Sequence, residues 1–311
     1  MLRYAATRML LVVPTVLGMV TIAFFTLRAL PGDPATAILG EFATEQALAD
    51  LRASLGLDQP LWVQFGRFLQ GLAAGDLGRS AITNQPAMGE VMSVLPASLM
   101  LGGCSVVVAI LLGLPIGVLS ALRQGSWVDY ILMVATITGI SFPVFLIGQV
   151  AIVLFAHTIN LFPAVGAGMP GDLLSQAHAM VLPALVLAAG GTAYIARLTR
   201  SAMLEVIRQD YILVARAMGL RQGRILWYAL RNALPPILGV IGVTFAVAIG
   251  NAILVEVVFS RPGLGSLIIK ATFSRDYQLL QAGLLVLSIS VVLVNLALDL
   301  LYPLVDPRVR R

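Results

Sequence analysis

Long apolar runs, separated by short charged segments, dominate the hydrophobic pattern of this chain. A helix needs about 20 apolar residues to cross a lipid bilayer. Six runs meet that requirement, at residues 9–27, about 95–122, about 131–156, 173–196, 232–255 and 277–298. The pattern therefore predicts an all-α integral membrane protein with six transmembrane helices.

The third of these runs belongs to an uncharged stretch, residues 130–171, which is too long for one helix. We therefore expect a span over about 131–156, followed by a loop rich in proline and glycine. A proline interrupts the helical hydrogen-bond ladder, so Ser141, Phe142 and Pro143 are predicted to kink this span. Such a kink suits the wall of a cavity.

The connections divide the chain into four predicted parts. Residues 1–30 form an N-terminal transmembrane helix, 31–94 an extracytoplasmic amphipathic segment, 95–303 a core of five spans, and 304–311 a tail. In the second part, apolar residues recur at the i, i+3, i+4 spacing of one helix face. They are Leu61, Trp62, Phe65, Phe68, Leu69 and Leu72. This helix either lies on the outer membrane interface or forms a platform for an extracytoplasmic partner.

Composition agrees with a membrane protein and excludes several enzyme classes. Hydrophobic residues make up 59% of the chain and charged residues 11%, whereas soluble domains average about 25% charged residues. Lys270 is the only lysine, and it lacks the glycine and hydroxyl neighbours of a phosphate-binding loop. His157, His178 and Cys104 are too few and too scattered to predict a metal site. We expect neither enzymatic activity nor a bound cofactor in this chain.

The arginines of the short connections predict the orientation of the spans. An even number of spans puts both termini on one side of the membrane. Thirteen arginines fall on that side: Arg3, Arg8, Arg123, Arg197, Arg200, Arg208, Arg216, Arg221, Arg224, Arg231, Arg308, Arg310 and Arg311. The short connections of the other side hold Arg28, Arg261, Lys270 and Arg275. Both termini and the connection 197–236 are therefore predicted to be cytoplasmic.

The connection 197–236 has the pattern of a compact helical hairpin. Two helical stretches flank Gly219, and glycine readily supplies the left-handed conformation that ends a helix. Pro235 and Pro236 mark the entry to the fifth span. A helical hairpin exposed beside the membrane is typical of a docking element.

This connection resembles the cytoplasmic EAA loop of ABC importer permeases, in particular those of the dipeptide, oligopeptide and nickel family. The resemblance lies in residues 210–219 and 230–233, although Leu213-Val214-Ala215 replaces Glu-Ala-Ala. Further matches follow in order along the chain, at 30–34, 55–61, 75–78, 140–143, 255–259, 262–265, 276–277, 299–303 and 306–308. The long segment after the first span is similar to that of the B-type transmembrane subunit.

The resemblance implies the permease subunit of an ATP-driven importer for di- or oligopeptides in the bacterial inner membrane. Its partners would be a second homologous permease, two cytosolic ATPases that bind ATP and Mg²⁺, an extracytoplasmic substrate-binding protein and membrane lipid, with no nucleic acid. The residues expected to couple the permease to the ATPases are Asp210, Tyr211, Ala215, Arg216, Ala217, Met218, Gly219 and Leu220.

Polar and helix-breaking residues within or near the spans are candidates for the transport pathway or its gates, because ionisable groups in a membrane usually face a cavity or a partner. The candidates are Ser141, Phe142, Pro143, Gln149, Asn251, Glu256, Pro262 and Gly263. Glu256 alternatively forms a structural pair with Arg261 or Arg275. Pro262 and Gly263 are also expected to precede a short external helix.

Two alternatives remain open on the residues alone. Glutathione, nickel chelates or another small solute could be the cargo of the same scaffold. The second alternative is an ion-coupled secondary transporter. It would require internal repeats and acidic groups at the middle of the membrane, and the sequence indicates neither of these two features.

The arginine asymmetry generates a topology prediction. Single cysteines introduced at Asp50 and Gln70 of a Cys104→Ser variant should react with a membrane-impermeant thiol reagent added outside intact cells. A cysteine at Arg224 should react only after the cells are permeabilised. Labelling of residue 50 or 70 from the cytosolic side alone would contradict the six-span topology.

Overall fold

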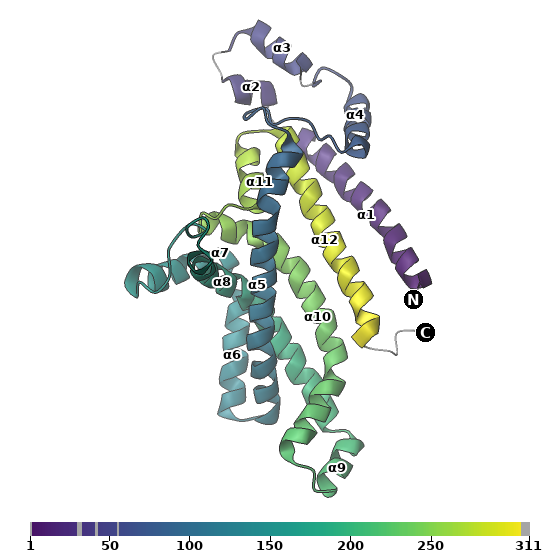
Figure 1. The fold of residues 1–311 in the computed structure, drawn as a ribbon, viewed down its shortest axis with the longest axis vertical. Coiled ribbons are helices and arrows are strands. Elements are labelled where there is room, and N and C mark those ends of the chain that lie inside the picture. The colour runs from purple at the N-terminus through teal and green to yellow at the C-terminus, as the bar shows by residue number, and fades with distance from the viewer. Residues whose placement is uncertain (1, 30–32, 41–42, 55, 306–311) are drawn as a thin grey trace. The chain divides into compact units, whose positions relative to one another are not determined.

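The computed structural model describes residues 2–29, 33–40, 43–54 and 56–305, and this part of the chain is almost entirely helical (Figure 1). The elements are α1 (Leu2–Ala29), α2 (Pro34–Leu39), α3 (Glu45–Ser54), α4 (Leu61–Ala74), α5 (Ala87–Leu122), α6 (Trp127–Ser141), α7 (Val144–Ala151), a π-helix (Ile152–Thr158), α8 (Leu173–Ile207), α9 (Asp210–Ala217), α10 (Gln222–Val258), α11 (Leu264–Phe273) and α12 (Tyr277–Val305). The tail expected over 304–311 lies outside the described residues from 306 onward.

The helices agree with an all-α membrane protein of six spans. Among the described residues, five helices are long and apolar enough to cross a bilayer, namely α1, α5, α8, α10 and α12. The bent pair formed by α6 and the segment Val144–Thr158 supplies a sixth if it counts as one span. The short helix expected after Gly263 is α11, and its external location stays a prediction.

The third span is broken rather than kinked. Its two halves meet at an angle of 106°. Phe142 adopts an extended conformation with φ −93° and ψ 138°, and Pro143 is the N-cap of α7. The residue before a proline is sterically driven out of the helical region, so the chain leaves α6 at Phe142 and starts a new helix after Pro143. The sequence located the break correctly but underestimated the change of direction.

The connection 197–236 is mostly helical as well. α8 continues to Ile207 and α10 begins at Gln222, which leaves only a short non-helical link on each side of α9. Pro235 and Pro236 lie inside α10 rather than at its start. These prolines cannot donate the usual backbone hydrogen bonds, but buried Ala233 and Ile237 anchor the helix on either side of them.

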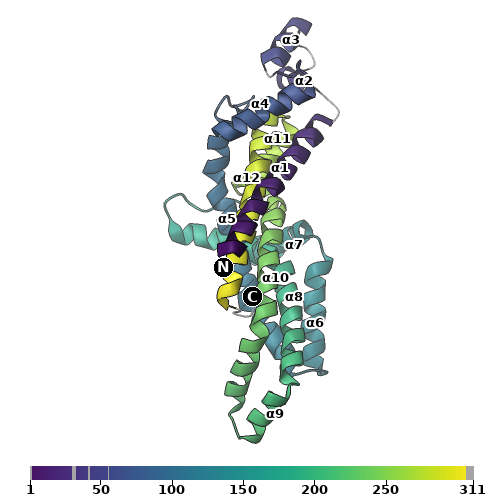
Figure 2. The same ribbon diagram turned by 90° about the vertical axis from the view of Figure 1, so that its right-hand side faces the viewer.

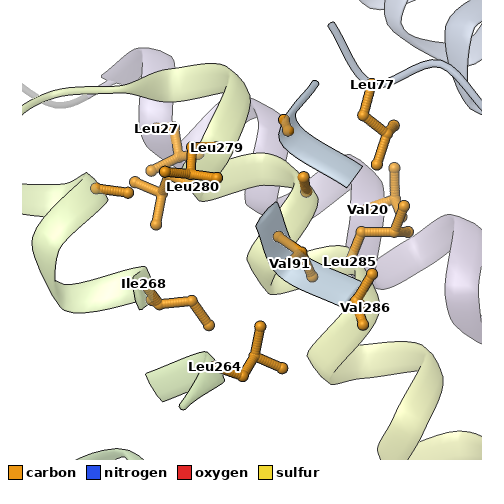
Figure 3. Packing of buried hydrophobic residues seen from close by; sticks show 13 residues of the cluster. Val20, Leu27, Leu77, Val91, Leu264, Ile268, Leu279, Leu280, Leu285 and Val286 are labelled. Carbon is orange, nitrogen blue, oxygen red and sulfur yellow. The ribbon is translucent and has the colours of Figure 1, made fainter. Parts of the chain in front are cut away.

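The chain forms two compact units, which group it differently from the four parts expected above. One unit contains residues 1–98 and 262–293, because α11 and the first part of α12 pack with α1, α4 and the start of α5. Figure 3 shows its apolar cluster. The labelled side chains are Val20, Leu27, Leu77, Val91, Leu264, Ile268, Leu279, Leu280, Leu285 and Val286.

Part of the apolar stripe of α4 packs against the apolar cluster of this unit. Phe68 and Leu72 pack against the cluster, and the rings of Phe65 and Phe68 lie 5.1 and 5.5 Å from the fully buried ring of Phe24. Trp62, in contrast, is 71% exposed. Part of the predicted amphipathic face is therefore used to hold α4 against α1.

The second unit contains residues 99–261 and 294–311. Figure 2 shows α6 and α10 beside α8 in this unit, and both helices contact α8. Two glycines permit close packing here. A Cβ atom at Gly117 would lie 2.5 Å from the carbonyl oxygen of Ala196, and one at Gly191 would lie 2.5 Å from Cγ2 of Thr244. Small residues at such crossings let helix backbones approach closely.

A buried carboxylate fixes the start of α12 in the first unit. Asp276 is 1% exposed, and its side chain accepts hydrogen bonds from the hydroxyl of Ser80 and from the backbone N–H of Leu279. Since Ser80 also accepts a hydrogen bond from the N–H of Thr83 at 3.0 Å, one network links the loop before α5 to α12.

We predict that Asp276→Ala destabilises the protein. Loss of hydrogen bonds to a charged group costs roughly 2 kcal/mol, so the purified variant should unfold at a lower temperature in detergent. Asp50→Ala, at an exposed position of α3, should leave the unfolding temperature unchanged. Equal unfolding temperatures for the wild type and Asp276→Ala would contradict the structural role of this network.

Candidate functional site

The helix α9 ends in a compact cap that depends on Gly219. The backbone N–H of Gly219 donates to the carbonyl of Arg216 at 3.0 Å, and the N–H of Leu220 donates to that of Ala215 at 3.2 Å. This pair of bonds forms a Schellman motif, which requires a left-handed residue after the helix. Gly219 has a φ of +74° and meets that requirement without strain.

One face of α9 packs against the helices on either side of it. Ile212 is fully buried in an apolar cluster with Met203 of α8 and with Ile225 and Ala229 of α10. The side-chain amide of Asn232, on α10, also donates a hydrogen bond of 2.9 Å to the hydroxyl of Tyr211. The position of α9 is therefore tied to both α8 and α10.

The opposite face of α9 is apolar and exposed. Its large side chains are Tyr211, Leu213, Val214 and Met218, with exposed fractions between 41% and 73%. Apolar surface left open in this way is characteristic of a contact site for another protein. Leu213 and Val214 were not among the predicted coupling residues, although their neighbours in the 210–219 motif pointed to this helix.

The other predicted coupling residues also lie on this short hairpin. Asp210, Arg216 and Ala217 are exposed, whereas Ala215 and Leu220 are half-buried and pack against the cluster around Ile212. A Cβ atom added at Gly219 would meet no atom of this chain within 4 Å. Packing within this chain therefore leaves room for a side chain at position 219, and it is the positive φ of Gly219 that favours glycine there.

A cavity of about 710 Å³ opens between the helices of the same unit. Its walls come from α5, the break between α6 and α7, the middle of α8 and the middle of α10. The polar side chains that line it are Ser105, Tyr194, Thr244 and Asn251, and none of the charged side chains in the described part of the chain lines it. This volume lies within the range of about 300–1,000 Å³ that is typical of small-molecule sites.

The structure brings some of the predicted pathway residues together and separates others. Phe142, Pro143 and Asn251 line the cavity. Ser141, Gln149 and Glu256 lie in the same unit but are not among the lining residues. Pro262 and Gly263 precede α11 and belong to the other compact unit.

Glu256 lies in a buried polar region at the end of α10. It is 1% exposed, and its backbone carbonyl accepts a hydrogen bond of 2.8 Å from the N–H of Arg261. The guanidinium of Arg261 donates to the carbonyls of Gly166 and Ala179 at 3.1 and 2.9 Å. Burial lowers the pKa of Arg261, and the nearby charge of Glu256 opposes that shift. These contacts hold the end of α10, and the pairing of the Glu256 side chain with Arg261 stays a prediction.

An ion pair that sequence reasoning missed joins α6 to α8. The Nε and Nη2 atoms of Arg200 donate to the two carboxylate oxygens of Asp129 at 2.8 and 2.7 Å. Asp129 also accepts hydrogen bonds from Ser120 and from the backbone of Gly125. The turn between α5 and α6 is therefore fastened to α8 close to α9. The local signal was Ser126, which caps α6 by accepting from the N–H of Asp129.

Comparisons with known proteins identify the family of the chain. Residues 113–311 match the family described as binding-protein-dependent transport system inner membrane component, and residues 1–100 match its N-terminal family. The dipeptide transport system permease protein DppB of Alkalihalophilus pseudofirmus is 40% identical over 100% of both chains. That of Escherichia coli K12 is 38% identical over 100% of this chain and 99% of its own.

A permease named for the transport of another solute and a chain of a solved structure are also similar to this chain. The glutathione transport system permease protein GsiC of Salmonella paratyphi A is 38% identical, over 100% of this chain and 99% of its own. A chain of the inward-facing MetNI methionine ABC transporter has a TM-score of 0.58, covering 70% of this chain and 97% of that one. At 22% identity, this structure supports the fold alone. The chain belongs to the family of binding-protein-dependent transport system inner membrane components and is a permease of an ABC importer.

Proposed function

We propose that the chain forms half of the translocation pathway of an importer for di- or oligopeptides and transmits ATP-driven motion to that pathway through α9. The observation that carries this proposal is the direct connection, within the second unit, between α9 and two helices that line the cavity. α8 and α10 both line the cavity, and α9 joins their ends. A displacement of α9 would therefore move two walls of the cavity.

The exposed apolar face of α9 supports a docking role. In the proposed complex, Tyr211, Leu213 and Met218 contact a groove on a cytosolic ATPase, while Ile212 anchors the helix to its own subunit. ATP and Mg²⁺ bind to the ATPases, and this chain contributes no catalytic residue. When the ATPase pair closes, the docked helices move and the cavity changes its access from one side of the membrane to the other.

The remaining partners follow from the same proposal. A second homologous permease completes the pathway, two ATPases lie in the cytosol with both termini of this chain, and a substrate-binding protein delivers cargo from outside. The excess of arginine in the predicted cytoplasmic connections supports this orientation.

Peptides are the proposed cargo because permeases named for dipeptide transport are 38–40% identical over the whole chain. Permeases named for glutathione transport have similar identity, so glutathione is the related substrate against which the proposal has to be tested.

Uptake by the reconstituted importer tests the cargo. Proteoliposomes that contain both permeases and the ATPases should import a radiolabelled dipeptide when ATP is inside and the binding protein is outside. Excess unlabelled dipeptide should abolish this uptake, whereas glutathione should leave it intact. ATP-dependent uptake of glutathione or a nickel chelate without uptake of any dipeptide would refute peptide cargo.

Gly219→Val tests the coupling role of α9. The left-handed conformation at φ +74° costs a branched residue about 1–2 kcal/mol, which is enough to disfavour the docked geometry by a factor of about 5–30. Transport and the stimulation of ATPase activity by loaded binding protein should therefore fall together, at an unchanged membrane level of the protein.

Gly223→Val is the matched control. An added Cβ at Gly223 also meets nothing within 4 Å, but its backbone is helical and needs no left-handed conformation. Both activities should stay within about twofold of wild type, as expected for an exposed site, and Arg224→Ala should behave alike. Full transport by Gly219→Val, or its loss from the membrane, would rule out the docking role.

A further inference from the structure

Two adjacent glycines on α8 face different surroundings in the second unit. At Gly191, an added Cβ would meet Thr244 at 2.5 Å and Ala109 at 3.2 Å, so this glycine is needed for packing against α10 and α5. At Gly190, an added Cβ would meet nothing within 4 Å, although Gly190 lines the cavity. Gly190 therefore leaves space open where any other residue would place a side chain.

The chemistry of the cavity restricts what can occupy this space. Its wall is mainly aliphatic, with Val186, Leu187 and Ala188 on α8 and Val243 and Val247 on α10. An ionised group buried among such side chains would lack a charged partner on the cavity wall. The free space therefore suits an apolar or uncharged polar group of limited size.

Neutral hydrogen-bonding groups accompany this apolar surface. Tyr194 lies one helical turn after Gly190, and Asn251 and Thr244 lie on the facing helix α10. Among the described residues, neither Tyr194 nor Asn251 makes a side-chain hydrogen bond within the chain, and both side chains are exposed. The side chains of Tyr194 and Asn251 are therefore available to the amide and carbonyl groups of a peptide backbone.

We propose that this cavity takes the uncharged side chain of a peptide in transit and that Gly190 sets the largest side chain that can pass. This inference rests on the proposed peptide import and adds a subsite and a size limit to it. Gly190 acts by leaving room, so its replacement narrows the cavity while the helix backbone and the contact between Gly191 and Thr244 remain in place.

Substitution of Gly190 in the complete reconstituted importer tests the proposal. Uptake of a dipeptide with two small side chains (Ala-Ala) and of one with two large side chains (Phe-Phe) is measured for wild type, Gly190→Ala and Gly190→Leu. For Gly190→Leu, the ratio of Phe-Phe to Ala-Ala uptake should fall about tenfold or more, the effect that small volume changes have in an apolar pocket. Gly190→Ala should give an intermediate ratio.

Gly103→Leu provides the matched control. Gly103 lies in α5 of the same unit, its added Cβ also meets nothing within 4 Å, and it is not among the residues that line the cavity. This variant should keep the wild-type ratio of the two uptake rates, even if the rates themselves change. The ratio separates a size limit from a general loss of structure, which lowers both rates alike.

Each other outcome overturns the inference. An unchanged ratio in both Gly190 variants would show that cargo does not pass this space. Loss of the second permease from the purified Gly190→Leu complex would identify the cavity as a contact with that subunit. If the wild-type importer carried neither dipeptide, the proposed peptide cargo itself would fail, which is a result distinct from an unchanged ratio.

Discussion

The close approach of α8 to its neighbours is the constraint on which the second unit depends. Glycines make this approach possible, since a Cβ at Gly113 would lie 2.9 Å from side-chain carbons of Ile195, and those at Gly117 and Gly191 would come still closer to other atoms. Apolar burial drives helix association only weakly in a membrane, where lipid is as apolar as leucine, so close backbone packing supplies much of the stability. These contacts hold α8 against α5 and α10, and the cavity opens among the same helices.

That packing gives α8 two roles. Its middle forms a wall of the cavity, and its end leads into α9, to which it is fixed by the buried side chain of Ile212. The pair between Asp129 and Arg200 adds α6 to the same assembly. Helices joined in this way are suited to move together, because packed interfaces shift between discrete arrangements rather than deform continuously.

The buried charged groups of the second unit lie away from its cavity. The cavity is lined by neutral residues, whereas the buried charged groups of this unit, Glu256, Arg261 and Asp129, lie outside its lining. Such groups hold turns and helix ends through hydrogen bonds, which offsets part of the cost of burying them. In the proposed importer, a neutral pathway would release its cargo readily, so that the external binding protein would carry out most of the selection and Gly190 would add a limit on side-chain size.

The sequence by itself determined the all-α class, the positions of the spans, the site of the helix break at Pro143 and the hairpin around Gly219. Each of these depends on local chemistry: the length of apolar runs, the steric effect of proline on Phe142 and the ease with which glycine adopts a positive φ. The extension of α10 through Pro235 and Pro236 was not predicted, because packing of Ala233 and Ile237 overrode a local signal.

Only the tertiary structure decided which residues share a site. It placed Phe142, Pro143 and Asn251 on one cavity, left Gln149 and Glu256 outside its lining, and grouped 262–293 with the N-terminal unit. It also paired Asp129 with Arg200, 71 residues away, and gave the neighbours Gly190 and Gly191 different roles. Such relations depend on which helix faces cross and at what distance, and the hydrophobic periodicity of one helix carries no information about the surface that meets it.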